Sequence, residues 1–169
     1  MGIDTVVTTD EPFWLGRSGN FYRALVVGDL EHTYQMAHPG VITMWSGAFA
    51  YWIHFPEFAQ LITGNMDVPY GIESHLRKMG TDPLTMMVFA KVSKVVVQTL
   101  FFAVFVRYLN KLVDRLTLSL ASLFIAFSPM MSGFDSALHV DGLFTQITMS
   151  AIAVTIWAGI RSEEVSLCE

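Results

Sequence analysis

LTMMVFAKVSKVVVQTLFFAVFV, residues Leu84 to Val106, is the longest apolar run in the sequence. A helix of about 20 apolar residues crosses the ~30 Å hydrocarbon core of a bilayer, so this run is long enough to span a membrane. Two later runs approach the same length, Leu116 to Gly133 and Leu143 to Ile160. We therefore expect an all-α, multi-span helical membrane protein with three transmembrane helices and short connections in residues 84–169.

The composition agrees with the membrane class. The 169 residues are 53% hydrophobic and 15% charged, whereas soluble domains have about 45–50% and about 25%. The excess of 15 Asp and Glu over 10 Lys and Arg excludes a basic nucleic-acid-binding protein, and the aromatic content excludes a disordered chain. The single cysteine, Cys168, cannot form an internal disulfide. The first 38 residues lack the pattern of a signal peptide.

A fourth apolar run, Gly40 to Phe55, is shorter. At ~1.5 Å per residue it reaches only ~24 Å as a helix, which favours a helix that lies in the membrane interface over one that crosses. On that interpretation residues 1–83 form an exterior loop with amphipathic and juxtamembrane helices. If the run crossed instead, residues 1–39 and 134–142 would lie on opposite faces of the membrane.

The charges of the connections orient the spans. The connection after the first span is basic and contains Arg107, Lys111 and Arg115. The next connection, residues 134–142, contains two aspartates and no Lys or Arg. Because basic connections stay in the cytoplasm, we expect residues 1–83 and 134–142 to lie outside, in a plasma (inner) membrane protein whose active face is exterior.

Asp10 and Glu11 are the candidate catalytic residues. They precede Pro12, and Trp14, Phe21 and Leu25 follow at helical spacing, so the pattern predicts a helix that ends at Gly28–Asp29. On one interpretation Asp10 only caps this helix. On the other, adjacent acids at a membrane surface supply one ionised base and one orienting partner for acid–base chemistry on a hydroxyl.

His38, Lys91 and Lys94 are candidate substrate-binding residues. His38 stands before Pro39, which favours extended backbone and a turn; as a site residue its imidazole would lie beside a phosphate at headgroup depth. Lys91 and Lys94 share one face of the first span with Gln98. They either face the protein interior or extend to the outer interface.

His139 and Asp141 complete the candidate binding set, just before the third span. Asp141 either caps that helix or supplies another carboxylate to the exterior pocket, and the two roles are compatible. Pro129 predicts a kink or an early end of the second span. Nothing in the sequence has the ligand spacing of a metal site, and a divalent cation would need the aspartates and histidines to converge.

The order of these elements resembles the amino-terminal part of the GT-C glycosyltransferases, and is most similar to family 39, the protein O-mannosyltransferases and aminoarabinose transferases. The matching positions are Asp10 and Glu11, His38–Pro39 before an apolar helix, and Asp141 before a later span. The resemblance covers roughly residues 8–160. Family members have about eleven to thirteen spans, one of them before the Asp-Glu pair, so we expect this chain to be a fragment with little or no activity by itself.

The resemblance implies transfer of a sugar from a polyprenyl-phosphate carrier to an acceptor hydroxyl, of a protein or a lipid, at the exterior face with inversion at the anomeric carbon. Asp10 would take the acceptor proton and Glu11 would orient it or the acceptor. His38 would bind phosphate or acceptor, and Asp141 would shape the pocket. No cofactor is implied with certainty, and no nucleic acid is an expected partner.

Two other classes remain open at this point. One is a small non-catalytic membrane subunit or scaffold, in which the acids cap helices and the lysines extend to the interface. The other is a transporter fragment, which the sequence favours less because it has no internal repeat.

Overall fold

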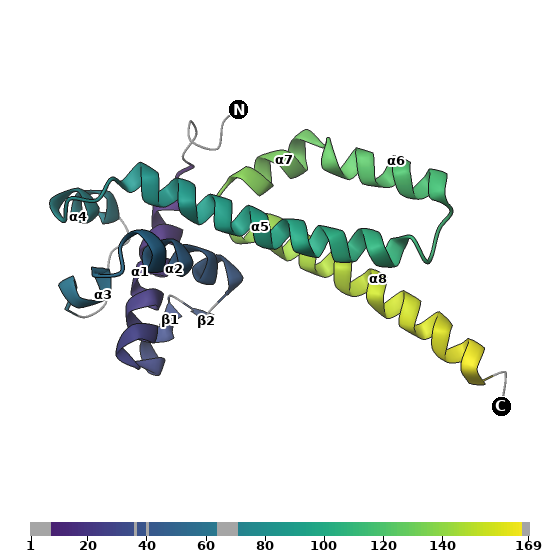
Figure 1. Cartoon of the computed structure of the whole chain (residues 1–169), viewed down its shortest axis with the longest axis horizontal. Helices are drawn as coiled ribbons and strands as arrows, with labels where there is room; N and C mark the ends of the chain where they lie inside the picture. The colour runs from purple at the N-terminus through teal and green to yellow at the C-terminus, as the bar shows by residue number, and fades with distance from the viewer. Residues whose placement is uncertain (1–7, 36, 40, 64–70, 167–169) are drawn as a thin grey trace. The chain divides into compact units, whose positions relative to one another are not determined.

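The computed structural model describes residues 8–35, 37–39, 41–63 and 71–166. In these ranges the chain is helical apart from one short antiparallel strand pair (Figure 1). The elements, in chain order, are α1 (Glu11–Val27), the 3-10 helix η1 (Leu30–Thr33), β1 (Tyr34–Gln35), β2 (His38–Pro39), α2 (Ile42–His54), α3 (Phe58–Leu61), α4 (Ile72–Lys78), α5 (Pro83–Leu109), α6 (Arg115–Ala126), α7 (Pro129–Ser136) and α8 (Val140–Ser166). The all-α expectation is confirmed for the described ranges.

The chain divides into two compact units, and the division falls inside α5. Unit 1 comprises Met1–Val96 and Ser136–Val140, and unit 2 comprises Val97–Asp135 and Asp141–Glu169. The sequence divided the chain at residue 83, where the first apolar run begins, whereas the compact units place the first part of α5 with the amino-terminal helices. Unit 1 therefore contains every candidate site residue except Asp141.

Helix α1 ends where the sequence predicts. Gly28 has a left-handed backbone (φ 74°), and its N–H bonds the carbonyls of Ala24 and Leu25, a C-terminal cap that glycine adopts without strain. The start differs from the expectation, because Asp10 stands at the N-cap with no side-chain hydrogen bond. The carboxylate used there is Glu11, whose Oε2 accepts from the Thr8 N–H at 2.6 Å. Asp10 therefore occupies the predicted cap position, but its side chain makes no capping hydrogen bond.

Helix α2 has 13 residues, so it is ~20 Å long at ~1.5 Å per residue and too short to cross a bilayer, as expected. One face is buried against α1. The other face exposes large apolar side chains, namely Trp45, Phe49, Trp52 and Ile53. Aromatic side chains of this kind favour the membrane interface, so an interfacial position for α2 stays the prediction.

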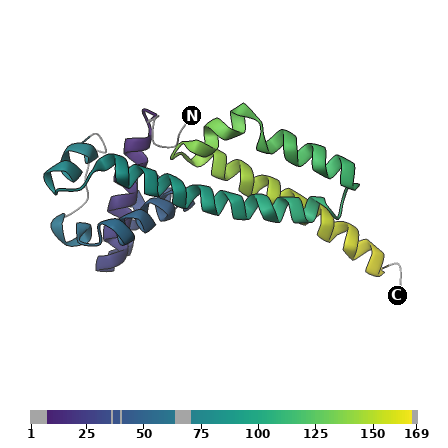
Figure 2. The same cartoon turned by 45° about the horizontal axis from the view of Figure 1, so that its top comes forward.

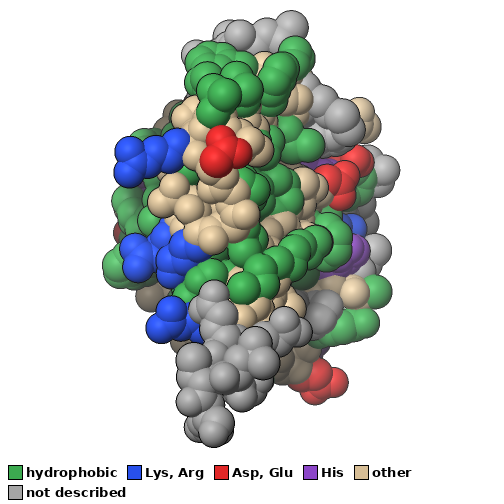
Figure 3. All heavy atoms as spheres, turned by 90° about the vertical axis from the view of Figure 1, so that its right-hand side faces the viewer, with side chains coloured by type: hydrophobic (Ala, Val, Ile, Leu, Met, Phe, Trp, Pro, Cys, Tyr) green, Lys and Arg blue, Asp and Glu red, His purple; other side chains and the backbone are tan. Residues whose placement is uncertain are grey.

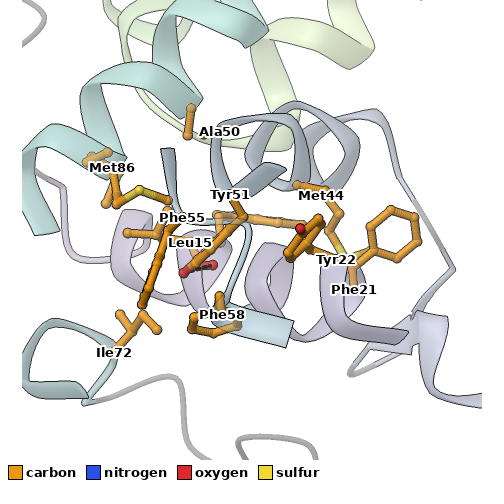
Figure 4. Packing of buried hydrophobic residues seen from close by; sticks show 14 of the residues in the cluster. Leu15, Phe21, Tyr22, Met44, Ala50, Tyr51, Phe55, Phe58, Ile72 and Met86 are labelled. Atoms are coloured by element: carbon orange, nitrogen blue, oxygen red, sulfur yellow. Dashed lines mark hydrogen bonds between the residues drawn. The ribbon is translucent and has the colours of Figure 1, made fainter. Parts of the chain in front are cut away.

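Tyr51 of α2 lies at the centre of the unit 1 core (Figure 4). It is fully buried, packs at 4.4 Å on Phe58, and its hydroxyl lies 3.3 Å from the Leu15 carbonyl of α1, to which it donates. Burial raises the pKa of Tyr51, so this hydroxyl stays protonated and keeps donating. The two helices approach closely at Gly47, where a Cβ would overlap the side chain of Ser18.

Two helices of the described ranges are long and apolar enough to cross a membrane, Pro83–Leu109 and Val140–Ser162. Within unit 2 they lie side by side, and the Ser150 hydroxyl of α8 donates to the Phe101 carbonyl of α5 at 2.7 Å (Figure 2). The first and third predicted spans are thus confirmed as helices of spanning length. Whether they cross a membrane, and in which direction, stays a prediction.

The second predicted span is wrong as a single helix. Helix α6 ends at Ala126, and α7 begins separately at Pro129. Proline fixes its own φ and disfavours helical backbone at Ser128, so the early end that Pro129 predicts is the one found. With 12 residues, α6 is ~18 Å long at ~1.5 Å per residue, short of a bilayer core.

Candidate functional site

A buried ion pair anchors the candidate site of unit 1. The Glu11 carboxylate of α1 lies 2.8 Å from the Lys91 ammonium of α5, with side-chain exposures of 0% and 2%. Such a pair survives burial only when its remaining hydrogen-bonding capacity is also filled. Glu11 meets this condition, because Oε2 accepts from Thr8 and Oε1 also accepts from the Leu138 N–H at 2.7 Å.

The same lysine face of α5 holds the segment before α8. Lys94 is fully buried and donates to the Ala137 carbonyl at 2.6 Å. Leu138 is buried in the same core, between these two anchors. The alternative left open by the sequence is therefore resolved for both lysines: they face the protein interior and do not extend to an interface. Lys94 thus ties residue 137 to α5, while Glu11, paired with Lys91, ties residue 138 to α1.

This fixation places His139 beside Asp10. The His139 Nε2 lies 3.8 Å from the Asp10 Oδ2, and the two side chains are 28% and 65% exposed. Asp10 is thus solvent-accessible, whereas its neighbour Glu11 is not. The adjacent acids have different environments, because one is exposed and the other is buried inside the protein. The sequence placed both acids at the same membrane surface, so it could not predict that one is exposed and the other is buried.

Trp14 is the aromatic centre of the site. The rings of His38 and His139 stand edge-on to its indole, with centroid distances of 5.2 and 5.9 Å. The Arg17 guanidinium lies 4.9 Å from the centroid of the same ring, a cation–π distance. Around one indole the structure therefore gathers a carboxylate neighbour, two imidazoles and a guanidinium from α1, β2 and the segment before α8.

Trp14 and Arg17 are the residues that sequence reasoning missed as site residues. The sequence places Trp14 at helical spacing with Phe21 and Leu25, and in the structure its side chain is only 3% exposed. Arg17 follows at the i,i+3 spacing at which helical side chains meet, and that spacing was the available signal. Its Nε is buried and has no hydrogen-bond partner within the described ranges, so the guanidinium retains donor capacity for a ligand.

Asp141 belongs to unit 2, whereas the other candidate residues belong to unit 1. Helix α8 begins at Val140, so Asp141 lies in the first turn and is exposed. The expectation that Asp141 caps this helix is wrong, because the helix starts one residue earlier. A carboxylate in a first turn still interacts favourably with the helix dipole.

Metal binding has a direct geometric test here. In the described part of the chain, no group of three or more His, Cys, Asp or Glu side chains could hold a metal ion. Asp10 and His139 approach each other, but they do not belong to such a group. The Arg17 guanidinium beside Trp14 matches an anion better than a metal cation.

The chain matches no family model, no curated protein and no solved structure. The proposal below therefore rests on the geometry of the described residues and on the sequence resemblance.

Proposed function

We propose that this chain carries the exterior site of a multi-pass membrane glycosyltransferase that moves a sugar from a polyprenyl phosphate to an acceptor hydroxyl. The observation that supports it is the approach of His139 to Asp10, 3.8 Å apart although 129 positions separate them in the sequence. The function requires these two segments on the same aqueous side, and both belong to one compact unit.

Asp10 is the general base in this proposal. Its exposed carboxylate accepts the proton of the acceptor hydroxyl as the acceptor oxygen attacks the anomeric carbon. The bond from that carbon to the phosphate oxygen breaks, the configuration inverts, and the carrier leaves as a polyprenyl phosphate. The phosphate needs no protonation to leave, but it gains charge that cations must stabilise.

Arg17, His38 and His139 are the groups that supply that stabilisation. A guanidinium presents paired N–H donors to phosphate oxygens, and each imidazole donates when it is protonated. These three side chains come from three separate segments and lie around Trp14. Asp141 stays a proposed pocket residue from the resemblance alone.

Glu11 takes a different role from the one first expected. Its oxygens are occupied by Lys91, Leu138 and Thr8 inside the protein, so it does not reach an acceptor. We assign it, with Lys91 and Lys94, as a positioning residue that sets the distance between Asp10 and His139.

The test is the substitution Asp10→Asn in the protein as its gene naturally encodes it. Membranes receive radiolabelled polyprenyl-phosphate mannose or aminoarabinose, and transfer to protein and lipid fractions is measured. Loss of a general base lowers turnover by about 10²–10⁴-fold. The matched control is Glu31→Gln, which neutralises an exposed acid of the same unit and should retain full turnover.

Two outcomes would overturn this proposal at different levels. Retained turnover by the Asp10→Asn protein, with normal resistance to alkaline extraction from the membrane, refutes the base assignment. Absence of transfer by the unmodified protein from either donor refutes the glycosyltransferase itself.

A non-catalytic membrane subunit is the second candidate, and the buried Glu11 and Lys91 pair favours it. A fully satisfied internal pair has a structural role whether or not chemistry occurs nearby. This candidate predicts that Asp10→Asn changes neither transfer nor stability, since Asp10 is exposed and makes no cap.

A further inference from the structure

The connection between α5 and α6 concentrates positive charge at one end of unit 2. Arg107, Lys111 and Arg115 are all exposed there. Lys and Arg side chains lie mainly along one side of the face shown in Figure 3. In a chain with a net charge of −5, this end is a local exception.

The one acid inside this segment has its oxygens already in use. The Asp114 carboxylate accepts from the Leu116 and Thr117 N–H groups and from the Thr117 hydroxyl, at 2.6 to 3.1 Å. These bonds lower the pKa of Asp114, so it stays ionised and contributes one negative charge. Three positive charges against one negative charge leave an excess of two, and within the described residues none of the three basic side chains forms an ion pair.

Lys111 is held over two aromatic rings. Its ammonium lies 4.0 Å from the Trp157 centroid and 4.9 Å from the Tyr108 centroid, and the two rings are 5.2 Å apart. Tyr108 belongs to α5 and Trp157 to α8, so the contact joins the two long helices at this level. Tyrosine, tryptophan and lysine are the residues that collect where hydrocarbon meets headgroups.

The helices that lead to this end are apolar on their exposed sides. Leu100 and Val104 of α5 are 63% and 38% exposed, and Ile156 of α8 is 49% exposed. An apolar shaft, an aromatic pair and an exposed basic group follow one another toward the end of unit 2. That order reproduces the polarity profile of one bilayer leaflet from its core to its headgroups.

We infer that the basic end, defined as Arg107, Lys111 and Arg115 with Tyr108 and Trp157, binds the phosphate of anionic membrane lipids. The side chains match this ligand because Arg and Lys donate to phosphate oxygens, while the two rings accept the glycerol and upper acyl region beside them. The inference rests on the membrane location of the proposed function but not on sugar transfer. A protein that transfers sugar and shows no lipid preference would overturn only this inference.

The experiment compares ligands on the purified natural protein in maltoside detergent. Thermal unfolding is followed as dioleoyl phosphatidylglycerol, dioleoyl phosphatidylcholine or inorganic phosphate is added, since a ligand of the folded state raises the unfolding temperature. The anionic lipid should stabilise the protein at a lower concentration than the zwitterionic lipid does. One basic side chain near a membrane surface contributes about 1 kcal/mol, which is about fivefold in affinity. Lys111→Gln should therefore lower the affinity for the anionic lipid by about fivefold.

The triple variant Arg107→Gln/Lys111→Gln/Arg115→Gln should lose the preference for the anionic lipid. The matched control is Arg77→Gln/Lys78→Gln, which neutralises two exposed basic residues of α4 and should keep that preference. Equal loss in the control, or a preserved preference in the triple variant, would overturn the site. An equal effect of inorganic phosphate would show a site for free oxyanions and not for lipids.

A second measurement keeps the inference testable if the triple variant does not fold. Sodium chloride raised from 0.05 to 1 M shortens the Debye length several-fold. The preference of the unmodified protein for the anionic lipid should fall accordingly, and a preference that is independent of salt would contradict binding by exposed charges.

Discussion

Unit 1 and unit 2 are both mainly helical, but they bury very different side chains. Unit 1 encloses aromatic residues and a satisfied ion pair, and Tyr51, Phe21 and Phe58 are almost completely buried. In unit 2, α6 has no buried residue, and Phe124 and Phe127 are 77% and 79% exposed. Unit 1 is therefore stabilised by its own core, whereas unit 2 leaves apolar surface that only a lipid or protein environment can cover.

The substitution with the largest expected effect on the core of unit 1 is Lys91→Met. It leaves the Glu11 carboxylate buried without its counter-charge, and removal of one partner of a buried pair costs about 3–5 kcal/mol. We expect a free energy of unfolding lower by that amount, measured by denaturant titration of the purified protein in detergent.

The double variant Glu11→Gln/Lys91→Met is the control for that prediction. It removes both charges, and the glutamine oxygen still accepts from the Leu138 N–H. We expect it to regain most of the lost stability. A single variant as stable as the unmodified protein, or a double variant no better than the single one, would show that the pair does not stabilise unit 1.

A smaller effect on stability is expected from glycine substitutions, which should act in opposite directions in the two units. Gly47→Ala adds a methyl group that overlaps the Ser18 side chain, and overpacking of this kind costs about 1–3 kcal/mol. Gly159→Ala in α8 adds the same group where nothing lies within 4 Å, and alanine is the better helix former by up to ~1 kcal/mol. Thermal unfolding should move down for the first and stay or move up for the second. A shift of the unfolding temperature in the same direction for both variants would contradict the difference in packing between the two units.

The smallest effect concerns the pH dependence of α6. Hydrogen bonds from Thr117 lower the pKa of Asp114 in the folded state, so its contribution to stability is present above about pH 4, the ordinary aspartate value, and is lost as the pH falls through the lowered folded pKa. Asp114→Asn keeps a capping side chain but removes the titration. The difference in helix content between the two proteins, measured by circular dichroism from pH 2 to 6, should be largest above about pH 4 and should shrink as the pH falls through the acid range. A constant difference across this range contradicts the assignment.

The sequence was sufficient wherever one local signal determined the structure. Gly28 ended α1, the short apolar run gave a helix of sub-membrane length, and two long runs gave helices of spanning length. The second span is not a single helix because Pro129 interrupts the apolar run, and the hydropathy of the run does not reflect the backbone geometry of one residue. Backbone geometry at one residue was decisive there.

The candidate site was only partly predictable, because pairing in space is not encoded by spacing. Lys91 and Lys94 required partners, since ionisable side chains in an apolar helix seldom stay unpaired. The sequence named no partner for them, and only the fold shows that Glu11 pairs with Lys91 while Asp10 stays exposed. Arg17 lay one helical turn from Trp14 and was overlooked because a single local pair carried no visible function.

The hydrogen bond from Leu138 to Glu11 joins residues 127 positions apart, and this has a consequence for biosynthesis. A ribosome that has completed α5 has supplied Lys91 but has not yet made Leu138. The first helix must therefore wait, with one acceptor of its buried carboxylate unfilled, until α6 and α7 have been translated. Unit 1 consequently matures late, and the order in which its parts become native does not follow the order in which they leave the ribosome.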